Sequence, residues 1–441
     1  MNELGKGVRR VLGLGVLGMV LVACGDLLTV DDPQRYTDED LDDALDAVAA
    51  GVEGDFHTAI DSWVVSQALM SDEYRHTGTW GGYEDLDLGR IRYDDTPYAS
   101  GAQNTLLEAR WAAQDAQERF ERVIGDGYET EAIHIQVKTV EGLTELIMGQ
   151  DWCEAPRGPG EEAIPSDEVL QQAVDNLTEA EGLAEVAGEE EWRQTAVAAR
   201  ARAHLLLENF DQAAQDASEI PDDFVYYARF STNTGRQNNW NVTVNTRGHN
   251  EQAGVAEPWQ DLVDTEQHLL RDPWTDELDP RVPIQHEGQM GQNGFSPHFS
   301  QWKHQGQGDD IRLLHSGEMR LIEAEVLWRN DDLEGALDIM NDVREAAGLS
   351  ELPGTNDPEE VRDYILHERF AETFMEGGRL TDLRRFGMVD EMHVERAENP
   401  GENIFGPDRP VMFPLSSSEG VNNPNIEDDR SERCLILASD V

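Results

Sequence analysis

Aromatic and amide side chains in two glycine-rich and asparagine-rich stretches offer the chemistry of sugar recognition. Trp80 and Tyr83 lie in TGTWGGYED, and Trp240 follows Asn239 in RQNNWNVT. Sugar rings present apolar C–H faces that stack on indole or phenol rings, while their hydroxyls need polar partners at the edge. The candidate ligand-binding residues are Trp80, Tyr83, Asn239, Trp240, Trp259 and Trp302. Plain packing in the core is the alternative for each tryptophan.

The sequence carries no signature of a catalytic, metal or cofactor site. With 90 Asp plus Glu residues, chance supplies many carboxylate pairs, so no pair can nominate a glycosidase. His76 and His367 lack the His-Glu-x-x-His order, and we find no Gly-x-Ser-x-Gly or phosphate-binding glycine motif. The acidic stretches YEDLDL and DDTP lack EF-hand spacing, and solvated loops are the favoured interpretation over calcium binding. The sequence therefore predicts a non-enzymatic protein with no catalytic residue, metal or cofactor.

Charged residues between Glu368 and Arg385 repeat at helical spacing. Glu368, Glu372 and Glu376 are four residues apart, and Arg369 and Arg379 lie among them. This spacing produces a helix face with ion pairs, or an arginine fork buried against a carboxylate. We interpret the cluster as scaffold.

The apolar run VLGLGVLGMVLVACGD near the N-terminus follows Lys6, Arg9 and Arg10. Its roughly thirteen apolar or small residues match the h-region of a signal peptide, whereas a membrane span needs about 20. Leu-Val-Ala-Cys resembles a bacterial lipobox, in which the cysteine is acylated and becomes the first residue. The prediction is a signal peptide over residues 1–23 and a lipid anchor at Cys24, which ties the mature chain to a bilayer without spanning it.

The two remaining cysteines, Cys153 and Cys434, could pair in an oxidising compartment. Two buried free thiols are an equally good interpretation at this point. Their neighbours lack the ligand spacing of a zinc site.

The chain is strongly acidic, with a formal net charge of -56. Such a surface repels phosphate backbones, so nucleic acid is excluded as a partner. Repulsion between like charges is a cost that falls as salt shortens the Debye length, which suggests a saline habitat. A merely acidic secreted protein is the alternative.

The elements that must position the candidate residues are mainly helical. Apolar residues recur at 3-4 spacing over 38–69, 106–124 and 131–148, and each stretch predicts a helix. Two later pairs, around 192–217 and 318–347, place small or aliphatic residues just after a turn, as in tetratricopeptide hairpins. Asp357 and Pro358 predict a helix start, while Gly348 and Gly377–Gly378 predict left-handed C-caps.

Residues of about 221–312 interrupt this pattern with Gly, Asn, Gln, Pro and aromatic residues. Such composition is typical of loops and short strands, where binding residues collect. The predicted fold is therefore mainly α: a tetratricopeptide-like frame of helical hairpins with a loop-rich insertion carrying short strands. The expected divisions of the body at 24–441 are a helical frame at about 38–220 and 313–390, the insertion at about 221–312, and a closing segment at about 391–441.

Four segments in the mature chain resemble one known family. They are DLLTVDDPQRYTDEDL with SDEYRHTGTWGGYEDLDL, the turn QDWCEAP, the stretch from WKHQGQGDDIRLLHSGEMRL through HERFAETFMEGGRLTDLRRFG, and the closing FPLSSSEGVNNPNI. Together and in this order they resemble the RagB/SusD family of nutrient-uptake outer-membrane lipoproteins. Ser417–Ser418 and the large acidic excess depart from the family pattern.

The resemblance implies a lipid-anchored, surface-exposed outer-membrane protein that captures a nutrient and passes it to a TonB-dependent transporter of the SusC type. In the family, ligand contacts come from the loop after the first long helix and from the insertion, which are the regions of Trp80 and Trp240. Oligosaccharides are the expected ligand, and peptides are the alternative. A tetratricopeptide-type scaffold that binds only protein is the competing function, although it would not need the aromatic and amide-rich insertion.

Overall fold

The computed structural model describes residues 37–91, 98–246, 248–257, 259–286, 288–389 and 409–426, together with residue 436. The predicted lipid anchor Cys24, the signal peptide 1–23 and Cys434 lie outside this range. A short N-terminal unit ends at Leu45 and holds helix α2 (Asp38–Asp42). Thr37 caps α2 through a reciprocal capping box with Asp40. The single helix expected from 38 to 69 is therefore two helices, because α2 ends at Asp42 and the next begins at Leu45.

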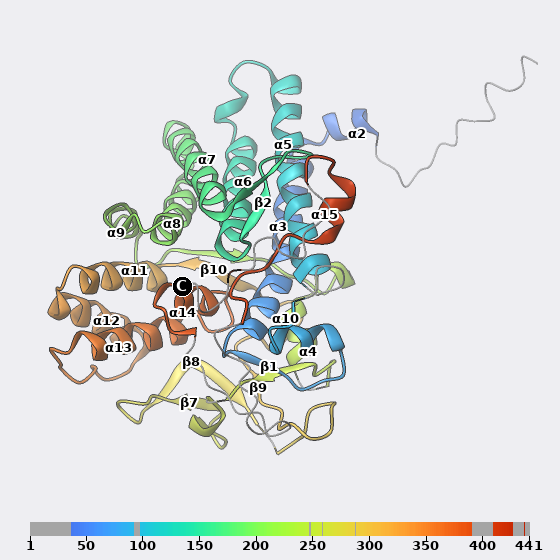
Figure 1. Ribbon diagram of the computed structural model, residues 1–441. Coiled ribbons are helices and arrows are strands. Elements are labelled where there is room, and N and C mark those ends of the chain that lie inside the picture. Colours follow the sequence, from blue (N-terminus) through green and yellow to red (C-terminus); the bar gives the residue numbers. More distant parts are fainter. Residues whose placement is uncertain are drawn as a thin grey trace, which may run out of the picture. The chain divides into compact units, whose positions relative to one another are not determined.

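The main unit, Asp46–Val441, opens with a series of long helices, and each after the first packs against its successor in the series (Figure 1). These are α3 (Leu45–Met70), α5 (Asn104–Ile124), α6 (Ala132–Asp151), α7 (Ser166–Ala187), α8 (Glu190–Leu206) and α9 (Phe210–Ser218). Helix α6 packs against α5, α7 and α8, and α8 packs against α9. A Cβ at Gly142 or Gly149 would lie 2.7 Å from the Cγ of Leu177 or Leu170, so these glycines permit the close approach of α6 to α7.

A second group of helices follows residue 315. It consists of α11 (Ser316–Arg329), α12 (Leu333–Ala347), α13 (Pro358–Glu372) and α14 (Arg379–Arg385). Helix α11 packs against α9, α12 and α13, and their shared core includes Leu321, Met340 and Tyr364. The alanines that the sequence places at the hairpin contacts, among them Ala199, Ala213 and Ala336, are fully buried. Small side chains at these contacts let paired helices approach closely, as in tetratricopeptide hairpins.

The predicted caps are confirmed at two of three positions. Asp357 accepts a hydrogen bond from the Glu359 amide at the start of α13, and Gly348 ends α12 with a φ of 78°. The prediction for Gly377–Gly378 is wrong, because α13 ends at Glu372 and Gly378 precedes α14. Gly377 has a positive φ of 87°, and a Cβ there would lie 2.4 Å from the Trp63 ring, so this position has no room for a side chain.

Short antiparallel strands lie mostly between the two helical groups in the sequence, although the first three strands come from within the first group. Strand β4 (Val225–Ala228) pairs with β10 (Ile311–His315), and β1 (Tyr74–His76) pairs with β5 (Ala253–Val255). A four-stranded sheet has the order β6 (Val263–Asp264), β7 (Leu269–Arg271), β8 (Leu278–Gln285) and β9 (Ser300–Gln301). Strands β2 (Glu154–Pro156) and β3 (Ala163–Pro165) form a separate hairpin. The short helices are α4 (Gly81–Asp87), α10 (Trp240–Asn245) and α15 (Ser417–Asn422).

The closing Asn-Pro-Asn has a structural role. The side-chain amide of Asn423 donates to the Glu161 carbonyl at 2.7 Å, and that of Asn425 donates to the Gly160 carbonyl at 2.6 Å. These bonds fasten the C-terminal segment to the turn between β2 and β3. The predicted fold class, a mainly helical frame with a strand-bearing insertion, is confirmed. No helix in the described ranges is both long and apolar enough to cross a membrane.

Candidate ligand-binding face

Two of the predicted tryptophans lie together although 160 residues separate them in the sequence. The rings of Trp80 and Trp240 stack with centroids 5.9 Å apart and an interplanar angle of 19°. Tyr83 meets Trp80 edge-on at 5.5 Å, and its hydroxyl accepts a hydrogen bond from Nε1 of Trp240 at 2.7 Å. We call Trp80, Tyr83 and Trp240 the aromatic cluster.

The aromatic cluster is built on the first residues of two short helices. Trp80 is the residue before α4, and Tyr83 lies in its first turn. Trp240 is the first residue of α10, whose N-cap is Asn239. The side-chain oxygen of Gln252 accepts from the amides of Thr79 and Trp80, at 2.7 and 2.9 Å, and so fixes the loop that carries Trp80.

The three members of the aromatic cluster differ in their exposure to solvent. Trp80 is 37% exposed and Tyr83 only 3%, while Trp240 is half-buried. Burial raises the pKa of the Tyr83 hydroxyl, which therefore stays neutral and can accept the indole N–H. The cluster thus offers one open indole face supported from behind by a second indole and a phenol.

A buried carboxyl group supports the cluster from α3. Oδ2 of Asp61 accepts from the backbone amide of Trp240 at 2.7 Å, and Asp61 is 3% exposed. Burial raises the pKa of Asp61 to about 7, although the hydrogen bond from Trp240 opposes this shift. Asp61 and Gln252 carry no signal in the sequence, because each lies far along the chain from the ring that it positions.

The other three candidate residues lie in packed surroundings. Asn239 is fully buried, where its Oδ1 caps α10 and its Nδ2 donates to the Asp309 carbonyl at 2.8 Å. Trp259 stacks on Phe370 at 3.9 Å and donates its indole N–H to the Asp72 carbonyl. Trp302 lies against His268 at 5.2 Å, in the region of the four-stranded sheet. None of these three rings or amides joins the aromatic cluster in the part of the chain that the structure describes.

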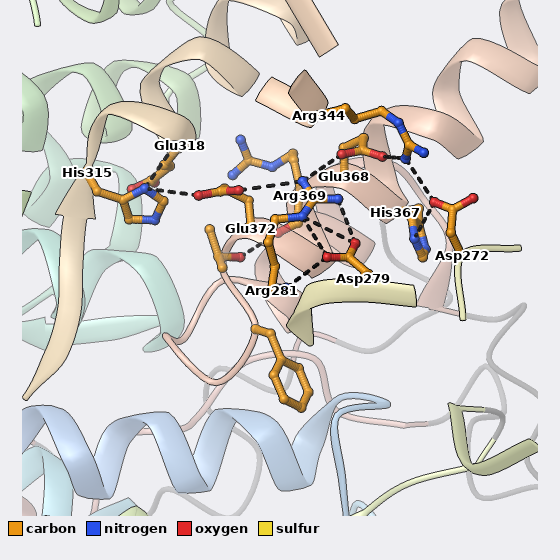
Figure 2. Close-up of polar contacts among 12 residues, drawn as sticks. Asp272, Asp279, Arg281, His315, Glu318, Arg344, His367, Glu368, Arg369 and Glu372 are labelled. Atoms are coloured by element: carbon orange, nitrogen blue, oxygen red, sulfur yellow. Dashed lines mark hydrogen bonds and ion pairs between the residues drawn. The ribbon is translucent and has the colours of Figure 1, made fainter. Parts of the chain in front are cut away.

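Glu368 of α13 and charged residues from other elements form a second cluster with a different character (Figure 2). Arg344 lies between Asp272 and Glu368, with nitrogen–oxygen distances of 2.8 and 2.5 Å. Arg281 contacts Asp279 at 2.7 Å and Glu368 at 2.8 Å. We call Asp272, Asp279, Arg281, Arg344 and Glu368 the buried ion-pair network, and all five side chains are at most 8% exposed.

The partners in this network come from strands and helices outside α13. Arg281 lies on β8 and Arg344 on α12, so the pairs join elements rather than neighbours along one helix. Beside the network, burial opposes ionisation of Glu376, but Lys303 and Arg312 outweigh it and hold the pKa of Glu376 well below its usual range. A cavity of about 900 Å³ borders this region, lined by Arg312, His315, Glu372 and others. Those side chains already contact one another, with Arg312 and His315 both within 3.6 Å of Glu372.

Cys153 is buried and takes part in a disulfide bond. Its predicted partner Cys434 lies outside the described residues, so the pairing stays a prediction. Within the described ranges, no group of three or more His, Cys, Asp or Glu side chains is arranged to hold a metal ion.

Known proteins that are similar to this chain belong to the family that its motifs resemble. A family model described as the SusD family matches residues 284–427. The SusD-like protein P38 of Formosa agariphila is 29% identical over 132 residues, which are 27% of this chain. That match spans 24% of the relative's length, or about a quarter.

Solved structures extend the likeness to most of the chain. A SusD superfamily protein from Bacteroides thetaiotaomicron has a TM-score of 0.65 at 13% identity, covering 87% of this chain and 99% of that one. Surface glycan-binding protein A from the same organism, in complex with laminarihexaose, has a TM-score of 0.63 at 12% identity, covering 90% and 99%. A SusD-like carbohydrate-binding protein from Bacteroides vulgatus has a TM-score of 0.63 at 14% identity, and the match covers 88% of this chain and 98% of that one. The fold is that of the SusD-like proteins, and the resemblance to the RagB/SusD family is confirmed.

Proposed function

We propose that this chain is a non-enzymatic outer-membrane lipoprotein that captures oligosaccharides and passes them to a TonB-dependent transporter of the SusC type. One observation carries the glycan-binding part. Trp80 and Trp240, from separate regions of the sequence, form a stacked pair whose outer ring is 37% exposed. An indole face held rigid in this way suits the apolar face of a sugar ring, because little side-chain freedom is lost on binding.

The relatives support the same class of ligand. Surface glycan-binding protein A shares the fold and was solved with laminarihexaose, and a further structural neighbour is described as a carbohydrate-binding protein. Among the six candidate residues, Trp80 and Trp240 now form the proposed contact surface. Tyr83 and Asn239 hold that surface in place, while Trp259 and Trp302 belong to other parts of the fold.

The membrane and transporter parts of the proposal depend on the sequence. Acylation of Cys24 would tether the body to the outer membrane, where a surface-exposed capture protein can meet its transporter. Peptide capture and a protein-binding scaffold are the alternatives. A stacked pair that joins the exposed Trp80 to Trp240 of the loop-rich insertion favours small-ligand capture over a scaffold.

Calorimetric titration with a panel of neutral oligosaccharides tests the proposed ligand class. The wild type is expected to bind at least one member, and Trp240→Ala should weaken that binding by ~1 kcal/mol or more, about fivefold in Kd. Trp328→Ala is the matched control, because Trp328 packs against Phe386 and donates to the Pro358 carbonyl, away from the cluster. Binding of peptides without any glycan would replace the proposed ligand class, and binding of neither would favour the scaffold function.

A further inference from the structure

A cavity of about 430 Å³ lies between helix α5, the turn after β2 and the C-terminal segment. Its lining includes Asn104, Glu108, Arg110, Trp111, Glu419 and Asn423. This volume lies in the range of small-molecule sites. We call it the Arg110 cavity, and it shares no lining residue with the aromatic cluster or the buried ion-pair network.

The walls of the Arg110 cavity are fastened by hydrogen bonds between distant segments. Asn423 and Asn425 donate to the carbonyls of Glu161 and Gly160. On the other side, the amide of Ser416 donates to Oε1 of Gln103 at 2.9 Å, which ties the C-terminal segment to the start of α5. The cavity is therefore a built feature of the fold and not a gap between loosely placed loops.

Arg110 supplies a buried cation to this cavity. The residue is 2% exposed, and its Nη1 nitrogen has no hydrogen-bond partner among the described residues. A guanidinium presents five N–H donors in a fixed fork, and leaving one buried donor unpaired is costly. A carboxylate or sulfate bound in the cavity would place an acceptor beside this guanidinium.

Burial and the neighbouring carboxyl groups act on the charge of Arg110 in opposite directions. Burial lowers the pKa of Arg110, while Glu145, Glu141, Glu419 and Glu161 act in the opposite direction. Burial together with Glu141 raises the pKa of Glu145 to about 8, so at neutral pH that carboxyl is mostly protonated. The carboxyl group of Glu145 therefore neutralises little of the charge of Arg110.

The other lining groups match a ring with hydroxyl groups. Trp111 also lines the cavity and is 56% exposed, so its indole is accessible to a ligand there. The carboxylates of Glu108 and Glu419 accept hydrogen bonds, and the amides of Asn104 and Asn423 add both donors and acceptors. Together these groups match the apolar face, the hydroxyls and one acidic substituent of a single sugar residue.

We propose that the Arg110 cavity binds an anionic sugar residue, a pyranose bearing a carboxylate or a sulfate ester. The acidic group contacts the guanidinium of Arg110, the ring face packs on Trp111, and the hydroxyls bond to the surrounding carboxylates and amides. This site is separate from the Trp80–Trp240 pair, and the proposal does not depend on that pair binding a ligand.

Salt dependence follows from this arrangement. The formal net charge of -56 repels any anion at long range, and salt screens that repulsion. The contact with the buried Arg110 is screened much less. Affinity for the anionic sugar should therefore hold or rise between 0.1 and 1 M NaCl, whereas binding to surface cations would weaken.

Calorimetric titration of the full chain tests the proposal with four probes: galacturonic acid, galactose 6-sulfate, neutral galactose and sodium sulfate. We expect at least one acidic sugar to bind, at least tenfold more tightly than galactose or sulfate alone. The first two probes distinguish carboxylate from sulfate ester. Arg110→Gln should weaken binding of the acidic sugar at least tenfold, and Trp111→Ala about fivefold. Arg193→Gln, which removes an arginine paired with Glu190 on α8, should change nothing.

Three results would overturn the proposal. The first is that neither acidic sugar binds the wild type at either salt concentration. The second is binding that is equal for galactose and galacturonic acid. The third is unchanged affinity in Trp111→Ala, a variant at an exposed position that tests the site even if Arg110→Gln does not fold.

Discussion

The aromatic cluster and the buried ion-pair network both gather reactive side chains from distant parts of the sequence, but they use them differently. In the network, Arg344 is fully buried between Asp272 and Glu368, and each charge meets its opposite inside the fold. In the aromatic cluster, Tyr83 and Asp61 are buried and bonded while Trp80 keeps an open face. Groups that satisfy one another hold the structure, and a supported group left open to solvent is available to a ligand.

The largest effect should come from breaking the network. Arg344→Met keeps much of the side-chain volume but leaves Asp272 and Glu368 buried with one partner fewer. Removing one member of a buried pair costs about 3–5 kcal/mol, because the remaining charge stays desolvated. Urea unfolding measures the loss.

Arg157→Met is the matched control for this variant. Arg157 forms exposed pairs with Glu162 and Glu168, so the urea midpoint should hardly change. Equal midpoints for the two variants would contradict the assignment of the network to the scaffold.

Asp61 shares features of both regions, since it is a buried titratable group, as in the network, and it supports the aromatic cluster. Its pKa is about 7 in the folded chain against 3.8 ordinarily, so the folded state binds its proton more tightly than the unfolded state does. Stability therefore falls as pH rises from about 4 to 7 and stays lower above that range. Asp61→Asn keeps an acceptor for the Trp240 amide and cannot ionise.

The measurement is the difference in free energy of unfolding between Asp61→Asn and the wild type across pH 4–8. The difference should grow in favour of the variant up to about pH 7, reaching a few kcal/mol, and then level off. Parallel pH profiles would show that Asp61 titrates normally in the folded chain.

Salt concentration should distinguish repulsion between surface charges from the ion pairs of the buried network. The expected effect is smaller than those of the two preceding predictions. The melting temperature of the wild type should rise between 0.1 and 1 M NaCl, because the charge of -56 repels itself less when screened. The penalty of Arg344→Met should stay nearly constant, since buried pairs are screened little. Divalent cations must be chelated throughout, and a penalty that vanishes at 1 M would place the network in contact with solvent.

The helical frame was predictable because it depends on local patterns. The spacing of Leu106 to Ile124 and the cap at Asp357 are signals within one or two turns, and both lead to helices observed here. The prediction for Gly377 is wrong, because a glycine is needed there to leave room for the Trp63 ring, which is more than 300 residues away in the sequence. Local sequence shows that glycine is present and does not show what approaches it.

The candidate site was predictable in part for the same reason. Trp80 and Trp240 stand out because glycine and asparagine flank them, which is unusual for core tryptophans. Trp259 was a candidate because it lies in the same insertion as Trp240, yet its partner Phe370 comes from α13 and makes it a packing residue. Arg110 gave no signal at all, because it lies in an ordinary amphipathic helix and its cavity is completed by residues near 160 and 420.

Paired measurement of binding and stability in Trp80→Ala tests most directly whether the open indole face serves a ligand. Calorimetry with the oligosaccharide that the wild type binds gives the affinity, and urea unfolding of the same sample gives the stability. The predicted result is a loss of affinity of ~1 kcal/mol or more, with a smaller change in unfolding free energy, because Trp80 is 37% exposed. Unchanged affinity together with a loss of several kcal/mol of stability, as expected for a core cavity, would contradict the role assigned to Trp80.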